Sequence, residues 1–192
     1  MPRLFSGLIA ALCLLAPAAR AAEMGWWRQL DVRGIDGAAL TPAGRWIVVV
    51  FLSPECPVAN ADIPVLNALA REFGPRGATF VGAYADPTLT LPELRRHATD
   101  YRLQYSLVDD RDQRLARAAG ATYTPEVCVY SRDGALLYRG RIDDRVGGFG
   151  AARPAATRED LREVLAALVA GRPGPFPSQP GFGCALPAPV RR

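Results

Sequence analysis

One junction constrains the fold more than any other feature of the sequence. The seven residues Trp46–Leu52 are all aromatic, β-branched or leucine, with no polar residue among them. Such a continuous apolar run is typical of a strand that is buried on both faces in the middle of a sheet. The run ends at Ser53-Pro54-Glu55-Cys56-Pro57, and a helical pattern of apolar residues follows from Asn60 to Phe73. The chain therefore passes from a central strand into a helix through a cysteine and a proline.

Strand patterns and helix patterns alternate along the rest of the chain. Arg132-Asp133-Gly134 lies between two strand patterns, and Asp-Gly is a strong signal for a hairpin turn. Three strand–helix units followed by two strands and a helix predict an α/β fold, with a mixed central sheet and helices on both faces. The predicted strands are 46–52, 78–85, 106–108, 126–131 and 135–139, and the predicted helices are 60–73, 91–101, 112–119 and 157–170.

The first 21 residues predict a secretory signal peptide. Arg3 precedes an apolar stretch, and Ala19-Arg20-Ala21 matches the small-residue pattern of a cleavage site. This divides the chain into a signal peptide (1–21), a folded domain (22–171) and a Pro/Gly-rich C-terminal tail (172–192), which we expect to be loop. The domain is then exported, to the periplasm in a Gram-negative bacterium, and reaches an oxidising compartment. The alternative is an uncleaved N-terminal anchor helix, which would hold the domain at a membrane.

Charge and hydropathy exclude two classes of protein. All 23 basic residues are arginine, against 19 acidic residues. The arginines form no stripe interleaved with aromatic residues of the kind that binds nucleic acid. No apolar run reaches the roughly 18 residues that a membrane span needs. We therefore expect no nucleic-acid partner and no integral membrane protein.

Three cysteines follow the leader: Cys56, Cys128 and Cys184. They are too few for a disulfide scaffold, so we interpret them by their chemistry. Cys56 lies at the start of a predicted helix, where the helix dipole and free backbone N–H groups favour a thiolate and lower the pKa of the thiol. Pro57 suits the first helical position because its missing N–H is not needed there. This pattern favours a reactive cysteine over an inert buried one.

Two kinds of charge bear on the Cys56 thiol. The carboxylate of Glu55 would raise the pKa of the thiol and so oppose the helix dipole. Arg139 and Arg141 are candidates for a compensating cation, but their position relative to Cys56 cannot be derived from the sequence.

Two segments resemble thioredoxin-fold proteins. The segment 51–60, followed by Pro64 at the spacing of the family's helix-kinking proline, resembles their active-site segment. Thr124-Pro125, at the start of a predicted strand, looks like the cis-proline element that the family places opposite its cysteine. The later hairpin and final helix resemble the exported redoxin branch, which is related to the peroxiredoxin-like alkyl hydroperoxide reductase/thiol-specific antioxidant group. Over about residues 30 to 170, the resemblance implies a thioredoxin-like three-layer fold, with Cys56 as the nucleophile and Pro57, Thr124 and Pro125 in the substrate-binding groove.

The sequence departs from each subgroup of this superfamily. A dithiol thioredoxin has a second cysteine where this chain has Ala59, and copper-handling Sco-type relatives have it where this chain has Asn60. Peroxiredoxins have a proline where this chain has Val49, although Ser53 agrees with their pattern. Cys56 is therefore a lone nucleophile within its motif, and needs a resolving thiol from elsewhere.

Two cysteines are candidates for that resolving thiol. Cys128 lies in the apolar run Val127-Cys128-Val129, which favours a small buried hydrophobe over a redox role. Cys184 lies between glycine and alanine in the tail, where a flexible approach would let it fold back over Cys56. We favour Cys184 as the partner, with an external thiol or a free tail cysteine as the alternatives.

These residues predict an exported thiol-dependent oxidoreductase in which Cys56 attacks a disulfide or a peroxide. Its partners would be a disulfide-bearing protein or a peroxide as substrate, and an external thiol as reductant. We expect no cofactor and no resident metal. One alternative is a Sco-like copper(I)-binding assembly factor, because thiolates are good ligands for copper(I). The other is a non-catalytic thioredoxin-fold binding module.

Three polar residues, His97, Asp143 and Asp144, are expected to lie at the surface and to have no catalytic role. His97, the one histidine, lies beside Arg95 and Arg96 on a predicted helix, and we expect it to be exposed. Asp143 and Asp144 lie between arginines, so we expect a solvated charge cluster rather than an acid–base pair.

Overall fold

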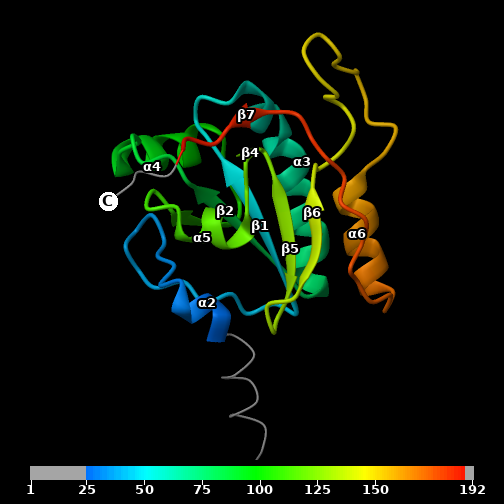
Figure 1. Ribbon diagram of the computed structural model, residues 1–192, viewed down its shortest axis with the longest axis horizontal. Helices are drawn as coiled ribbons and strands as arrows, with labels where there is room; N and C mark the ends of the chain where they lie inside the picture. Colours follow the sequence, from blue (N-terminus) through cyan, green and yellow to red (C-terminus); the bar gives the residue numbers. More distant parts are fainter. Residues whose placement is uncertain (1–24, 189–192) are drawn as a thin grey trace, which may run out of the picture.

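The computed structural model describes residues 25–188, in which a five-stranded mixed sheet forms the centre (Figure 1). The strand order is β3-β2-β1-β5-β6. The first three strands along the chain run parallel, β5 is antiparallel to β1, and β6 is antiparallel to β5. The strands are β1 (Trp46–Leu52), β2 (Ala78–Tyr84), β3 (Ser106–Asp109), β5 (Val127–Ser131) and β6 (Leu136–Gly140).

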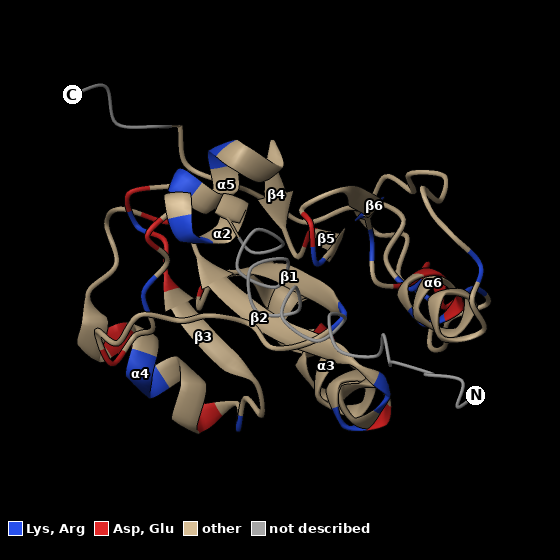
Figure 2. Ribbon diagram, turned by 90° about the horizontal axis from the view of Figure 1, so that it is seen from below, with Lys and Arg blue, Asp and Glu red and all other residues tan. Residues whose placement is uncertain are grey.

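Helices cover both faces of this sheet. Figure 2 shows α2 and α5 on one side, with α3, α4 and α6 on the other, while charged residues lie mainly on the outer elements. The predicted α/β fold with a mixed sheet and three layers is therefore confirmed. The helices are α2 (Gly25–Gln29), α3 (Pro57–Phe73), α4 (Leu91–Asp100), α5 (Arg114–Ala119) and α6 (Asp160–Val169), with a 3₁₀ turn at Gly74–Arg76.

Strand β1 forms the middle of the core because both of its faces are buried. Val48, Val50 and Leu52 pack in a cluster with residues of α3 and α6, and the alternate residues pack against α2 and α5. All seven residues of β1 are buried, as the continuous apolar run predicts. Since β1 is fixed by both layers, the segment that follows it is held in a defined place.

The structure describes most of the C-terminal segment but not the predicted signal peptide. The predicted signal peptide, 1–21, lies outside the described residues. The described part of the tail, 172–188, is mostly irregular, but Cys184–Ala185 forms a short strand, β7, antiparallel to β4 (Tyr123–Thr124). None of the helices within residues 25–188 is long and apolar enough to cross a membrane.

Three expectations about polar residues were wrong. His97 is only 4% exposed, because α4 turns this side chain toward Tyr84 of β2. Asp143 and Asp144 are also buried instead of solvated. The side chain of Asp143 pairs with Arg145, at 2.8 Å between Oδ2 and Nε.

Asp144 also explains why the last helix begins late. It accepts hydrogen bonds from the backbone N–H of Thr157, at 2.7 Å, and of Arg158, at 3.0 Å, as well as from the Thr157 hydroxyl. The hydroxyl of Thr157, the first residue of the predicted helix, is thus bound to a distant carboxylate. The helix begins at Asp160 instead of Thr157.

Candidate active site

Cys56 caps the N-terminus of α3, at the carboxyl end of β1. Its backbone is extended, and its Sγ accepts a hydrogen bond from the backbone N–H of Ala59 at 3.4 Å. Pro57 occupies the first helical position, as predicted. The Cys56 side chain is fully buried, so a second element must cover its sulfur.

Part of this cover is the segment before β5, which contains a cis peptide bond between Thr124 and Pro125. The carbonyl oxygen of Thr124 lies 3.2 Å from the Sγ of Cys56 and accepts a hydrogen bond from the protonated thiol. The backbone N–H of Phe51 donates to the carbonyl of Glu126 at 3.0 Å, which fastens this segment to β1. The structure thus brings Cys56 together with Thr124 and Pro125.

The rest of the cover is the C-terminal tail. In the register between β4 and β7, Cys184 is the partner of Thr124. The two thiols lie close enough to shift each other's pKa: Cys184 lowers that of Cys56, and Cys56 raises that of Cys184. Both cysteines are free thiols, so the structure shows a reduced pair of adjacent sulfur atoms.

Hydrogen bonding polarises this pair. Burial raises the pKa of Cys56, but hydrogen bonds from Cys184, the Thr124 side chain and the Ala59 backbone outweigh it and hold the pKa below its ordinary value. Burial and the neighbouring Cys56 raise the pKa of Cys184 to about 11. The first proton to leave is therefore that of Cys56, while Cys184 keeps its own and donates to the Cys56 thiolate.

Cys128 is separate from this pair. It lies in β5, opposite Val49 of β1 in the sheet register, and is fully buried. Burial raises the pKa of its thiol to about 12. Its position agrees with the prediction of a small buried hydrophobe.

A hydrogen-bonded chain that the sequence did not predict supports the active-site loop. Asn60 donates through Nδ2 to the carbonyl of Pro54 at 2.8 Å, and its Oδ1 lies 2.8 Å from Nε2 of His97. Since an amide oxygen only accepts, Nε2 carries the proton, and Nδ1 accepts from the Tyr84 hydroxyl at 2.7 Å. A buried tyrosine and histidine thereby fix the residue two positions before Cys56. The one sequence feature that could have indicated this hydrogen-bonded chain is a polar residue, Asn60, one helical turn after Cys56.

The candidate cations Arg139 and Arg141 pair with buried carboxylates, and neither is among the groups that shift the pKa of Cys56. Arg139 pairs with Glu126, at 2.5 Å between Nε and Oε1, and Arg141 pairs with Asp160, at 2.6 Å between Nε and Oδ2. Both carboxylates are buried. These arginines serve as partners of buried carboxylates, and the polarisation of Cys56 comes from the hydrogen bonds described above.

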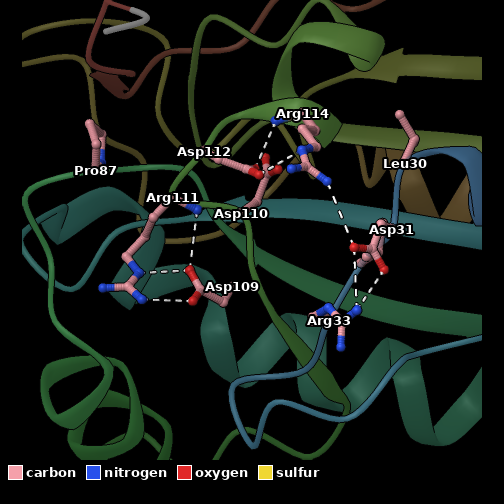
Figure 3. Close-up of a pocket in the computed structure, with 10 residues that line it drawn as sticks. Leu30, Asp31, Arg33, Pro87, Asp109, Asp110, Arg111, Asp112 and Arg114 are labelled. Carbon is pink, nitrogen blue, oxygen red and sulfur yellow. Dashed lines mark hydrogen bonds and ion pairs between the residues drawn. The ribbon is translucent and has the colours of Figure 1, made fainter. Parts of the chain in front are cut away.

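A cavity of about 450 Å³ lies elsewhere, between the segment after α2 and the carboxyl end of β3 (Figure 3). Arg111 pairs with Asp109 and Arg114 with Asp112, each at 2.7 Å, and Arg33 pairs with Asp31 at 3.1 Å. The arginines and carboxylates of this cavity thus neutralise one another. None of the predicted site residues lines it.

The combination of a mixed sheet, a cysteine at the start of α3 and a proline segment against its sulfur defines a thioredoxin-fold thiol-dependent oxidoreductase. The sequence profile of the AhpC/TSA family matches residues 28–139, and the chain belongs to this family. No curated protein matches the chain.

Solved structures of similar fold agree with this assignment. An uncharacterised conserved protein from Geobacillus kaustophilus is 26% identical, with a TM-score of 0.71 over 84% of this chain and 89% of its own. Two others, at lower identity, show the shared fold. The bacterioferritin comigratory protein of Xanthomonas campestris is 23% identical, with a TM-score of 0.56 over 79% of this chain and 95% of its own. A secreted disulfide oxidoreductase of Mycobacterium tuberculosis, homologous to E. coli DsbE, is 22% identical, with a TM-score of 0.54 over 73% of this chain and 98% of its own.

Proposed function

We propose that this protein reduces a disulfide or a peroxide with Cys56 as the nucleophile and Cys184 as the resolving thiol. The observation that carries the proposal is that Thr124 brings the two thiols together: its carbonyl oxygen lies 3.2 Å from the Cys56 Sγ, and Cys184 is its register partner in the neighbouring strand. Depressing the pKa of one thiol while raising that of its neighbour separates their roles, because the thiolate attacks first. Pro57, Thr124 and Pro125 border the sulfur and would contact the substrate.

With a peroxide, the Cys56 thiolate attacks one oxygen and the O–O bond breaks. The products are a sulfenic acid on Cys56 and, after protonation, an alcohol or water. The sulfur of Cys184 then attacks the Cys56 sulfur, and the sulfenic oxygen leaves as water. Two thiols are oxidised to a Cys56–Cys184 disulfide while the peroxide is reduced.

With a disulfide, the Cys56 thiolate attacks one sulfur and releases the other as a thiol. Cys184 then attacks the Cys56 sulfur of the mixed disulfide and releases the second substrate thiol. Both routes end in the same Cys56–Cys184 disulfide. An external thiol reductant returns it to the dithiol by two successive exchanges.

The proposal is tested by the thiol state of the purified protein, measured by mass spectrometry before and after one equivalent of hydrogen peroxide or of an oxidised small disulfide. We expect loss of two thiols and a peptide pair linking Cys56 to Cys184. The Cys56→Ser variant should form no such pair, and Cys184→Ser should stop at a sulfenic acid or mixed disulfide on Cys56. Cys128→Ser is the matched control, and should behave as the parent. Cys56 reacting no faster than an ordinary thiol would contradict the proposal.

The adjacent sulfur atoms also favour a second candidate, copper(I) binding, because two soft thiolates can hold this ion. Titration with copper(I) under reducing conditions, followed by thiolate absorption in the ultraviolet, separates the two functions. Stoichiometric binding lost in Cys56→Ser and in Cys184→Ser, together with slow peroxide and disulfide reactions, would favour the copper function.

Export remains part of the proposal. We propose that residues 1–21 are a cleaved signal peptide, on the basis of their charge and apolar pattern. The N-terminal sequence of the protein recovered from its native cell fraction tests this, with Ala22 as the expected first residue.

A further inference from the structure

Residues 179–187 of the C-terminal tail are hydrogen-bonded to the protein beside the candidate active site. Figure 1 shows this red segment running from the end of α6 across the top of the sheet to β7, beside β4. We call Gln179–Leu186 the strap. At its start, the carbonyl of Gln179 accepts from the backbone N–H of Arg141 at 2.9 Å. At its end, the backbone N–H of Leu186 donates to the carbonyl of Thr122 at 2.9 Å.

Further contacts hold the middle of the strap and the residue after it. The backbone N–H of Gly181 donates to the Tyr123 hydroxyl at 3.0 Å. The side chain of Gln113, which is buried, donates through Nε2 to the carbonyl of Pro187 at 2.9 Å. The strap is therefore bound by groups from several elements.

Two glycines allow the strap to approach this closely. A Cβ on Gly183 would lie 1.9 Å from the carbonyl oxygen of Thr124, and a Cβ on Gly140 would lie 2.1 Å from the carbonyl oxygen of Gln179. Neither distance is possible for real atoms, so a side chain at either position would force the strap away. Gly183 is the more informative of the two, because its backbone does not have the positive φ of Gly140. A substitution there acts through the contact alone.

The strap occupies the edge of β4, where another extended chain could pair instead, and forms a separate two-stranded sheet with it. An extended polypeptide binds an exposed strand edge through its backbone groups, and alternate side chains then face the protein. Here the edge of β4 is already paired, in antiparallel register, with Cys184 opposite Thr124. Cys184 thus occupies, within the same chain, the position that a cysteine of an added strand would take beside the Cys56 sulfur.

We propose that the strap is a specificity determinant: it competes with extended polypeptides for the β4 edge and reserves Cys56 for small oxidants. This inference rests on the proposed function of Cys56. A polypeptide disulfide reacts only in the fraction of molecules whose strap is released, so its apparent rate is reduced by that fraction. Hydrogen peroxide does not bind a strand edge and needs only a small opening of the cover to reach Cys56, so its rate depends much less on full release of the strap.

The test compares two oxidants on full-length variants that all carry Cys184→Ser, so that no resolving thiol is present. One oxidant is hydrogen peroxide, and the sulfenic acid on Cys56 is trapped with dimedone. The other is a cysteine-containing extended peptide activated as the mixed disulfide with thionitrobenzoate. In that reaction the Cys56 thiolate forms a disulfide with the peptide sulfur and releases the coloured thionitrobenzoate thiolate.

Adding Gly183→Val should raise the rate with the peptide by about tenfold or more, and change the rate with peroxide by less than about threefold. The matched control is Ala185→Val, which adds the same side chain at an exposed position of β7. This control should leave both rates near the parent values. A peptide rate unaffected by Gly183→Val would overturn the inference. Failure of Cys56 to react with either oxidant would instead overturn the proposed function.

A measurement on the unmodified protein covers the case in which Gly183→Val fails to fold. The backbone N–H of Leu186 should exchange with deuterium slowly in the reduced protein, since it is hydrogen-bonded within the docked strap. Exchange as fast as in an unstructured peptide would show that the strap does not compete, and would also overturn the inference.

Discussion

The Sγ of Cys56 lies 3.2 Å from the carbonyl oxygen of Thr124, and Thr124 is in turn the register partner of Cys184. Thr124, one residue of a two-residue strand, therefore connects Cys56 at the start of α3 with Cys184 in the C-terminal tail. The three residues come from separate segments, and their approach depends on the pairing of β4 with β7.

Replacing Cys184 by alanine should raise the pKa of Cys56, because the hydrogen bond from Cys184 is one of those that lower it. The thiolate fraction of Cys56 at a given pH below that pKa would fall, and alkylation would slow. The check is the rate of alkylation of Cys56 by iodoacetamide as a function of pH, with the midpoint expected at higher pH in the variant. Cys128→Ala should leave the midpoint unchanged, and an unchanged midpoint in Cys184→Ala would contradict the assignment.

Asn60→Ala should loosen the active-site loop. The substitution removes the donor to the Pro54 carbonyl and leaves the Nε2 proton of His97 without its acceptor. Leaving a buried donor unsatisfied costs about 1–3 kcal/mol, which should appear in the free energy of unfolding by urea. Thr99→Ala is a suitable control, because it removes an exposed hydroxyl that bonds only the backbone of its own helix. A loss no greater than that of the control would argue against the hydrogen-bonded chain.

The stability of the fold should depend on His97 at mildly acidic pH. Burial lowers the pKa of His97 below its ordinary value, although Asp100 partly opposes this. As the pH falls, His97 therefore becomes protonated in the unfolded chain before it does so in the folded protein. The stability that the neutral histidine contributes is complete above about pH 6.5 and is lost as the pH falls through the lowered pKa. We expect the free energy of unfolding to fall more between about pH 7 and pH 5 in the parent than in His97→Gln. Asp62 and Asp110, whose pKa values burial raises to about 7, titrate in both proteins. Equal pH dependence in the two proteins would refute the prediction.

Arg139→Ala should destabilise the fold far more than the loss of a surface ion pair. It leaves the carboxylate of Glu126, which is 3% exposed, without its cation. Removing one partner of a buried pair costs about 3 kcal/mol, somewhat less here because Arg139 is itself 32% exposed. The matched control is Arg33→Ala, whose pair with Asp31 is solvated and should contribute less than about 1 kcal/mol. Thermal unfolding of the two variants measures the difference, and equal losses would contradict this account.

The parts of the fold that were predicted correctly are those with local causes. β1 follows from its own apolar run, and Cys56 at the start of α3 follows from that strand and from Pro57. The polar residues that were misjudged depend on distant partners. A pattern of arginines around Asp144 cannot show that it binds Thr157, and the sequence of α4 does not show that His97 faces Tyr84.

The tail is an intermediate case. Glycine on the N-terminal side of Cys184 suggested that the segment could approach Cys56. The register with Thr124, however, depends on a backbone contact at Gly183 for which no periodic pattern exists. The approach of Cys184 to Cys56 could therefore be predicted, but the register that produces it came only from the structure.

Because β7 pairs with β4, the part of the chain that is needed for the reaction is longer than the part that is needed for folding. A chain cut after Val169, where α6 ends, would retain all five strands of the sheet and nearly all of both packed layers. It would nevertheless lack one of the two sulfur atoms, and the uncovered edge of β4 would be open to pairing with a second copy. Fragments designed only from the extent of the sheet would thus be well folded and prone to associate and, on the proposed function, unable to complete a redox cycle.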